Sequence, residues 1–322
     1  MAQSNRHPCA RHPVWYGQGV RNYVKITISG ASGLIGRRLM KNLTAAGHSM
    51  HVLSRHAGTN LPPGVRLSVW DPLKGQPPEE SLRDADAVIH LAGEPVAQRW
   101  TADSKRRIRE SRVAGTRNLV QALARLPRKP EALICGSAIG YYGSRGDEIL
   151  KESSAGANTY LGEVCQAWEK EAQGAEPLGV RVVRVRTGVV LDGRGGALQR
   201  MLPPFRMGVG GRLGDGKQWM SWIHLEDLAG MFQFALDHPV SGALNGVAPY
   251  PVINAEFTRA LAQALHRPAI FPVPAFALKA LFGEMSEILL GSQRVTPAAA
   301  EAAGFPFRFP QLAPALAEAL RV

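Results

Sequence analysis

Residues 24–36 read VKITISGASGLIG, and this stretch decides the fold. A β-rich run leads directly into Gly30, Gly33 and Gly36, and a helix-length amphipathic run follows over 35–46. A glycine triplet alone is a weak signal, but a strand, a glycine turn and a helix in this order are typical of dinucleotide binding. The first glycine permits the tight turn, the second lets the backbone approach a pyrophosphate, and the third allows close helix–sheet packing. We therefore predict a pyrophosphate held by free N–H groups at the helix N-terminus.

Further β-rich runs alternate with helix-length stretches through the first 190 residues. Each of these runs is mostly apolar rather than alternating, as expected for strands that are covered on both faces. The expected strands are 24–29, 50–53, 66–70, 86–92, 131–137 and 180–186, and the expected helices are 35–46, 101–125 and 159–176. Repeated β-α-β order predicts an α/β fold, a Rossmann-type doubly wound parallel sheet with right-handed crossovers.

The character of the chain changes after about residue 190, where Gly and Pro become frequent, as in PPFRMGVGGRLGDG (203–216). A helix-rich tail follows around 254–321. We predict a cofactor-binding domain over 24–240, with a glycine-rich excursion at 192–218, and a smaller C-terminal α/β substrate lobe over 241–322. The lobe would cover the ligand edge of the sheet.

Residues 1–23 stand apart because they carry three arginines, no acidic residue and no apolar core of a secretory signal. Two interpretations remain open. The segment is either a disordered basic extension, or the product of a wrongly assigned start, with Val24 as the first residue of the protein.

The amino-acid composition gives no sign of a membrane-spanning segment or of a cysteine-based metal site. The chain has 322 residues, 45% of them hydrophobic, and it contains no apolar run of about 18 residues that would predict a membrane span. Cys9, Cys135 and Cys165 are scattered and form no metal-binding pattern. Free thiols fit a reducing compartment, so we expect a cytoplasmic protein without a metal site.

The formal net charge of +12 raises the question of nucleic acid. The densest basic stretch, SKRRIRESR (104–112), lies on an expected helix, has acids at Asp103 and Glu110, and contains no interleaved aromatic residues. We therefore interpret most of the charge as a solvated face together with a site for a phosphorylated small ligand, and we expect no nucleic-acid partner.

The end of the second expected strand selects the cofactor. An NAD site usually has Asp or Glu there to bind the ribose hydroxyls, but this chain has Ser54 and Arg55. A guanidinium pairs well with a 2′-phosphate, and a serine hydroxyl can donate to the same group. Arg37, just past the glycines, could flank this phosphate. The sequence therefore predicts NADP(H) over NAD(H).

Small residues follow the fourth expected strand, where a nucleotide could lie across the sheet edge. His90 falls within an apolar run and is expected to be a core residue, whereas Glu94 is a candidate for binding a cofactor hydroxyl. Arg112 is expected near the same edge. The predicted cofactor-binding residues are Gly30, Ser32, Gly33, Leu34, Ile35, Gly36, Ser54, Arg55, Asp71, Leu91, Ala92, Gly93, Glu94 and Arg112.

Several motifs in a fixed order carry a family resemblance: the glycine turn, HLAG (90–93), SRVAGT (111–116), SAIGYYG (137–143) and YLGEV (160–164). Together they resemble the extended, epimerase-like branch of the short-chain dehydrogenase/reductases. The stretches LPPFRMGVGGRLGDGKQWMSWIHLED (202–227), LNGVAPYPVINAEF (244–257) and GFPFRFP (304–310) are similar to a narrower group. That group comprises epimerase-family proteins with a small C-terminal domain of unknown function, including cell-division-inhibitor-like members.

The resemblance implies a catalytic set. It makes Ser137 the residue that hydrogen-bonds a substrate carbonyl or hydroxyl, and Tyr160 the general acid/base. Val164 stands where the family keeps a lysine that holds the nicotinamide ribose and lowers the tyrosine pKa. A tyrosine with a pKa near 10 is only about 0.1% phenolate at pH 7, so alcohol oxidation should suffer more than carbonyl reduction.

Other roles are left open by the sequence. Tyr160 and Tyr142 could be packing residues, and a replacement cation could come from Arg112, Arg145 or Arg186. Trp219, Trp222 and His224 could line a substrate pocket, or could pack in the core at the start of a helix that is capped by Glu226 or Asp227. Arg206, Arg212 and Lys217 could bind an anionic substrate, or could lie in a solvated loop.

Two function classes follow. The first is an NADP(H)-dependent oxidoreductase or epimerase-like enzyme for a small carbonyl or sugar-like substrate. The second is a catalytically silent NADP(H)-binding regulator, for example in cell division. A homodimer through 101–125 and 158–176 is possible in either case.

Overall fold

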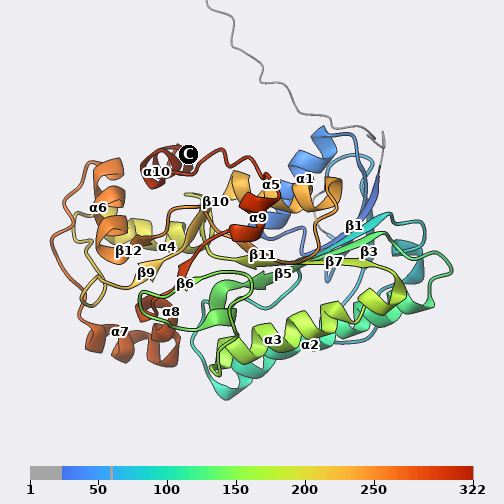
Figure 1. Ribbon diagram of the computed structural model, residues 1–322, viewed down its shortest axis with the longest axis horizontal. Helices are drawn as coiled ribbons and strands as arrows, with labels where there is room; N and C mark the ends of the chain where they lie inside the picture. Colours follow the sequence, from blue (N-terminus) through green and yellow to red (C-terminus); the bar gives the residue numbers. More distant parts are fainter. Residues whose placement is uncertain (1–23, 59–60, 322) are drawn as a thin grey trace, which may run out of the picture.

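The sheet at the centre of the protein contains seven parallel strands (Figure 1). The computed structural model describes residues 24–58 and 61–321, so the expectations for residues 1–23 lie outside the described residues. The strands are β1 (Lys25–Ser29), β2 (Ser49–Ser54), β3 (Arg66–Val69), β4 (Ala87–His90), β5 (Ala132–Ala138), β7 (Arg181–Thr187) and β11 (Gly242–Gly246). Their order is β11-β7-β5-β4-β1-β2-β3, and every neighbouring pair is parallel. The predicted doubly wound sheet is confirmed.

Helices cover both faces of this sheet (Figure 1). On one face, α1 (Leu34–Ala45) and α5 (Leu225–Asp237) pack with β1 in a cluster of buried apolar side chains. On the other, α2 (Ala102–Arg125) and α3 (Tyr160–Gln173) run side by side over β4 and β5. Because both faces are covered, β1, β4 and β5 bury nearly all of their residues. The strand β7 departs from the expected apolar pattern, since its sequence RVVRVRT holds three arginines.

The chain reverses direction across the sheet at β1, which lies between β4 and β2. From β1 the chain adds β2 and then β3 on one side of the sheet. From β3 it crosses back to β4, on the other side of β1, and continues outward to β5, β7 and β11. In open α/β sheets this switch point opens a crevice at the carboxyl ends of the strands, and ligands bind there. The glycine turn after β1 and the HLAG segment after β4 therefore meet at one place.

A smaller lobe covers one end of the sheet, at the left of Figure 1. Its core includes buried side chains from α4 (Gly196–Arg206), α6 (Asn254–Leu265) and α10 (Leu312–Ala319). The other helices of this region are α7 (Ala275–Phe282) and α8 (Ser286–Leu290), whereas α9 (Ala298–Ala302) packs with α5 and β11 against the central sheet. Short strands complete the lobe: β6 (Ile149–Leu150), β8 (Val189–Leu191), β9 (Trp219–Met220), β10 (Trp222–His224), β12 (Val252–Ile253) and β13 (Arg294–Val295).

The seventh strand, β11, begins beyond residue 240, where the sequence-based prediction ended the cofactor-binding domain. The sheet thus takes one edge strand from the segment that was assigned to the substrate lobe. The GALNG sequence of β11 holds two glycines and an asparagine, which are depleted in strands, so its pattern gave no strand signal.

Candidate functional site

The glycine turn brings three backbone segments unusually close together. Gly30 has φ +76°, and a Cβ there would lie 2.7 Å from the Leu91 carbonyl carbon. A Cβ on Gly36 would lie 2.3 Å from the Gly30 carbonyl oxygen. Glycine is therefore required at both positions, one for the approach of β1 to the segment after β4 and one for the approach of α1 to the turn.

The start of α1 is open to a ligand. Gly33 is the N-cap residue with extended backbone, no side chain caps the helix, and its first turn holds no acidic residue. A Cβ built on Gly33 would meet only the Gly30 carbonyl oxygen, at 3.3 Å, and both Ser32 and Gly33 are exposed. Uncapped N–H groups at the positive end of a helix fit a dinucleotide pyrophosphate.

A groove of about 850 Å³ lies beside this turn. It is lined by Ser32 from the turn, by Arg37 and Lys41 from α1, and by Ser54 from the end of β2. Arg55 is exposed and directly follows Ser54. The groove thus brings basic and hydroxyl side chains together, with no acidic residue among those that line it. Phosphate binding by these residues stays a prediction.

Lys41 and His56 also line this groove, although the sequence-based prediction did not include them. A signal was available for Lys41, because it lies four residues after Arg37 and therefore on the same face of α1. His56 lies in the loop after β2, and no periodic pattern places a loop residue in this way.

The segment after β4 packs against Arg112 of α2. The Leu91 N–H donates to the Ser29 carbonyl at 3.1 Å, and Arg112 Nη1 donates to the Glu94 carbonyl at 2.9 Å. A Cβ on Gly93 would lie 3.1 Å from the guanidinium carbon of Arg112. Arg112 therefore lies at this edge of the sheet, where the sequence placed it, and burial lowers its pKa.

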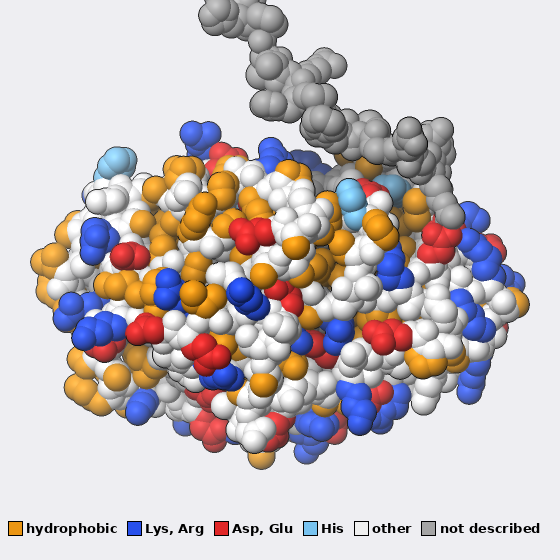
Figure 2. Space-filling view, viewed as in Figure 1, with side chains coloured by type: hydrophobic (Ala, Val, Ile, Leu, Met, Phe, Trp, Pro, Cys, Tyr) orange, Lys and Arg blue, Asp and Glu red, His pale blue; other side chains and the backbone are white. Residues whose placement is uncertain are grey.

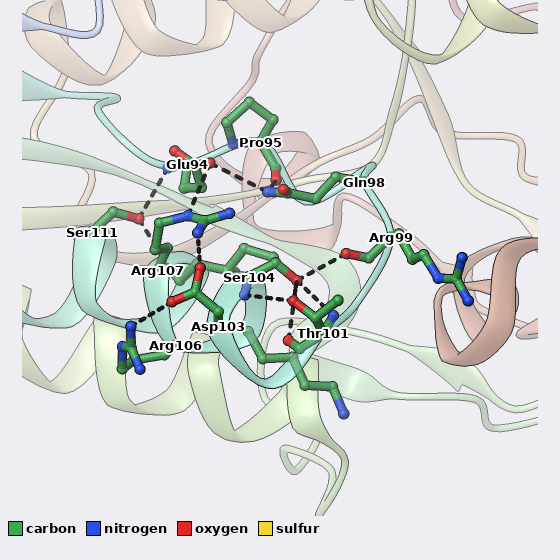
Figure 3. Close-up of polar contacts among 12 residues, drawn as sticks. Glu94, Pro95, Gln98, Arg99, Thr101, Asp103, Ser104, Arg106, Arg107 and Ser111 are labelled. Atoms are coloured by element: carbon green, nitrogen blue, oxygen red, sulfur yellow. Dashed lines mark hydrogen bonds and ion pairs between the residues drawn. The ribbon is translucent and has the colours of Figure 1, made fainter.

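Glu94 and the start of α2 form a polar cluster (Figure 3). The Glu94 carboxylate accepts a hydrogen bond from Gln98 at 3.4 Å and lies 3.8 Å from Arg107 Nε. Asp103 pairs with both Arg106 and Arg107. These ion pairs fit the interpretation of the basic stretch as a solvated helix face. Cofactor binding by Glu94 stays a prediction, and so does cofactor binding by Asp71, which pairs with Lys74 at 3.7 Å.

His90 is a core residue of β4, as predicted. Its Nδ1 lies 2.6 Å from Ser29 Oγ, and its Nε2 has no hydrogen-bond partner among the described residues. Burial lowers its pKa from 6.5 to about 4. Burial likewise lowers the pKa of His224 to about 4. Both histidines are therefore neutral at pH 7.

These two histidines should make the protein acid-sensitive. Each has a folded-state pKa below its unfolded value of 6.5, so the unfolded chain gains protons first as the pH falls. Stability is then complete above about pH 6.5, and each histidine should remove about 1.4 kcal/mol per pH unit down to about pH 4. Urea denaturation at pH 7 and pH 5 measures this slope. His224→Asn keeps an N-cap side chain and should reduce the slope by about half; an unchanged slope would contradict the prediction.

Ser137 belongs to a buried polar network. Its Oγ donates to Glu169 Oε1 at 2.7 Å, and Glu169 also accepts from Arg186 Nε at 2.7 Å and Nη2 at 2.8 Å. Arg186 Nη1 donates in turn to the Tyr142 hydroxyl, which donates to Asn245 Oδ1 at 2.7 Å. Burial alone would lower the Arg186 pKa, but the hydrogen bonds and charge of Glu169 outweigh burial and raise it.

Tyr160 begins α3 and packs against Trp100, with ring centroids 5.1 Å apart. Its hydroxyl donates to the Lys105 carbonyl at 2.8 Å. Burial raises the Tyr160 pKa, and the charges of Arg112 and Arg109 partly offset this shift. Val164 is buried. Of the three cations considered as substitutes for the lysine, Arg145 pairs with Glu148 and Arg186 with Glu169, which leaves Arg112.

The aromatic cluster of the lobe is structural for the most part. Trp222 is fully buried and donates to the Tyr250 carbonyl at 3.1 Å. His224 is the N-cap of α5, since its Nδ1 accepts from the Glu226 N–H at 3.2 Å. The prediction that Glu226 or Asp227 caps this helix was wrong. The Asp227 carboxylate instead accepts from two backbone N–H groups of the GFPFRFP segment.

Residues 24–58 and 61–321 contain no helix that is both long and apolar enough to cross a membrane. Within the same described ranges, no three His, Cys, Asp or Glu side chains come together as metal ligands.

Comparisons with known proteins match nearly the whole chain. Residues 26–248 match the NAD dependent epimerase/dehydratase family, and residues 273–319 match a domain of unknown function, DUF1731. Epimerase family protein MT2273 of Mycobacterium tuberculosis is 42% identical over 90% of this chain and 96% of its own length. The chloroplastic epimerase family protein SDR39U1 homolog of Arabidopsis thaliana is 39% identical over 90% of this chain and 85% of its own. The crystal structure of human SDR39U1 (isoform2) with NADPH superposes with a TM-score of 0.83, at 35% identity over 93% of this chain and 100% of that one.

Proposed function

This chain belongs to the NAD-dependent epimerase/dehydratase family, and from that premise we propose that it is an NADP(H)-binding enzyme that reduces a small carbonyl or sugar-like substrate. One observation carries the cofactor assignment. The groove beside the glycine turn brings Arg37, Lys41 and Ser54 together with no acidic residue in its lining. The human relative solved with NADPH supports the same choice.

The proposed binding mode follows from chemistry that the chain already presents. The uncapped N–H groups of α1 hold the pyrophosphate, and Gly33 leaves room for it. Arg37 and Lys41 pair with the 2′-phosphate, Arg55, which directly follows Ser54, is proposed to join them, and Ser54 donates to the same group. Bound NADPH supplies the hydride for carbonyl reduction.

Tyr160 is the proposed proton donor. Because burial raises its pKa, the side chain is a neutral phenol at pH 7, which can donate a proton but is a poor base. This state suits reduction of a carbonyl better than oxidation of an alcohol. To act, the hydroxyl must exchange its bond to the Lys105 carbonyl for one to the substrate. Ser137 is proposed to orient the substrate, and its present bond to Glu169 must be shared or exchanged in the same way.

The same two hydrogen bonds favour a second candidate function, a regulator that binds NADP(H) and turns nothing over. Both predicted catalytic hydroxyls have internal partners, and Val164 supplies no cation. A protein of this kind would act by presenting a cofactor-dependent surface to a partner.

Tyr160→Phe distinguishes the two candidates. The purified protein is incubated with NADPH and a panel of small aldehydes, ketones and nucleotide sugars, and NADPH consumption is followed by absorbance. For the enzyme, we expect the variant to lose about 100-fold or more in kcat while NADPH affinity stays the same, since only the proton donor is removed. Tight NADPH binding with no turnover of any substrate by the unaltered protein would support the regulator.

Tyr141→Phe is the control, because it removes a phenol in the neighbouring AIGYYG segment that was not predicted to act in catalysis. Turnover that is unaffected by Tyr160→Phe would show that another group donates the proton.

A further inference from the structure

The C-terminal lobe carries a second groove, of about 890 Å³, which we call the basic groove. Its lining comes from two separate parts of the chain: α6 with the segment 266–272 that directly follows it, and Arg212 in the glycine-rich loop. Figure 1 shows α6 at the left end of the molecule, whereas α1 and β3 lie to the right of its centre. The basic groove shares no lining residue with the groove beside the glycine turn, so it is a separate site.

Basic side chains converge on this groove. Arg212, Arg259 and Arg267 line it together with His266, and no acidic residue is among the lining residues. Within the part of the chain that the structure describes, none of these three guanidinium groups forms an ion pair with a carboxylate. Concentrated positive charge without internal compensation raises the local concentration of anions.

The loop that carries Arg212 is held in place by its backbone. The Arg212 carbonyl accepts from the Val273 N–H at 2.8 Å, and the Gly214 N–H donates back to the Val273 carbonyl at 2.9 Å. Gly211 lies so close that a Cβ there would be 1.8 Å from the Phe271 carbonyl oxygen. This wall is therefore preorganised, which lowers the entropic cost of binding a ligand.

Stabilisation of α6 explains only part of this charge. His266 is the C-cap of α6, with φ 51°, and Arg267 follows it. Basic residues at this position complement the negative end of the helix dipole. Arg259 lies in the middle of α6, and Arg212 lies outside the helix altogether. Their convergence with Arg267 needs another explanation.

The remaining lining residues indicate the chemistry of the part of the ligand that carries no phosphate. Thr258 and Gln263 offer hydrogen-bonding groups, while Pro272 and Ile270, a residue that is 71% exposed, provide apolar contact. Figure 2 shows Lys and Arg side chains interspersed with hydrophobic ones at this end of the molecule. We propose that the basic groove is a second ligand site, for a soluble small molecule that carries at least two phosphate groups next to an apolar portion.

Calorimetry with inorganic pyrophosphate tests this site on the full chain, with saturating NADPH present to occupy the first groove. We expect a single class of sites, and the double variant Arg259→Ala/Arg267→Ala should raise the pyrophosphate Kd by about tenfold or more. Arg106→Ala/Arg125→Ala removes the same charge from the exposed face of α2 and should leave the Kd within about twofold. If the first double variant melts early, Arg212→Ala alone provides the same test from a different wall.

Each other result would overturn the proposal. Pyrophosphate that does not bind would rule out a phosphate site. Equal weakening by both double variants would mean that only the net charge attracts the anion. Sedimentation of the protein with phosphatidylserine vesicles, without pyrophosphate binding, would assign the charge to a membrane surface instead.

Discussion

Replacing Glu169 with alanine is expected to lower the free energy of unfolding by about 3–5 kcal/mol. Glu169 and Arg186 each have side chains that are only 4% exposed, and the carboxylate also accepts from Ser137. The substitution would leave the Arg186 charge and the Ser137 hydroxyl in the interior without their main partner. A buried charge without a partner costs far more than the intact pair contributes. Urea denaturation followed by circular dichroism measures the loss.

Glu171→Ala is the control for this prediction. Glu171 lies two residues further along α3 and pairs with Arg117, whose side chain is 52% exposed. A pair of this kind contributes only about 0–1 kcal/mol. Comparable losses from the two variants would mean that α3 packing, rather than the buried network, determines the effect.

Much of the sheet could be predicted because its information is local. An apolar run of the right length between glycine-rich or polar turns indicates a buried parallel strand, and β1, β2 and β5 show it. The strand β7 is instead recognisable by its β-branched valines. The strand β11 could not be found in this way. Its buried Asn245 is stabilised by distant partners, the Tyr142 hydroxyl and the Thr296 carbonyl, which no local pattern reveals.

The candidate site likewise has one part that local sequence predicts and another part that depends on distant contacts. The glycine turn and Ser54-Arg55 are single segments, so their chemistry can be read from spacing. The partners of the predicted catalytic residues are not local. Ser137 meets Glu169, which is 32 residues away, and Tyr160 meets the Lys105 carbonyl, which is 55 residues away. A motif identifies such a hydroxyl but does not show which group it contacts in the folded chain.

The His224 cap shows a third kind of limit. Acidic residues are common at helix starts, so Glu226 and Asp227 suggested the cap of α5. In the fold, the Asp227 carboxylate is needed to hold the backbone at Arg308 and Phe309, and the imidazole of His224 takes the capping position. Tertiary contacts thus override a local preference.

The double variant Arg37→Ala/Arg55→Ala is expected to weaken NADPH binding by about 100-fold or more while it changes NADH binding little. Each guanidinium in contact with a phosphate contributes about 1.5–3 kcal/mol, and NADH has no 2′-phosphate to lose these contacts. Arg37 lines the groove beside the glycine turn, and Arg55 directly follows Ser54, which lines it too. Isothermal titration calorimetry with both dinucleotides measures the two affinities, and their ratio reports the phosphate contacts alone.

Arg66→Ala/Arg83→Ala controls for the loss of two positive charges. Arg66 begins β3 and Arg83 precedes β4, so both lie at the amino end of the sheet, away from the glycine turn. This control should leave both affinities within about twofold, because exposed charges beyond a Debye length are screened. Tighter binding of NADH than of NADPH by the unaltered protein would contradict the 2′-phosphate assignment. An equal loss for both dinucleotides would instead place these arginines near the pyrophosphate, which the two cofactors share.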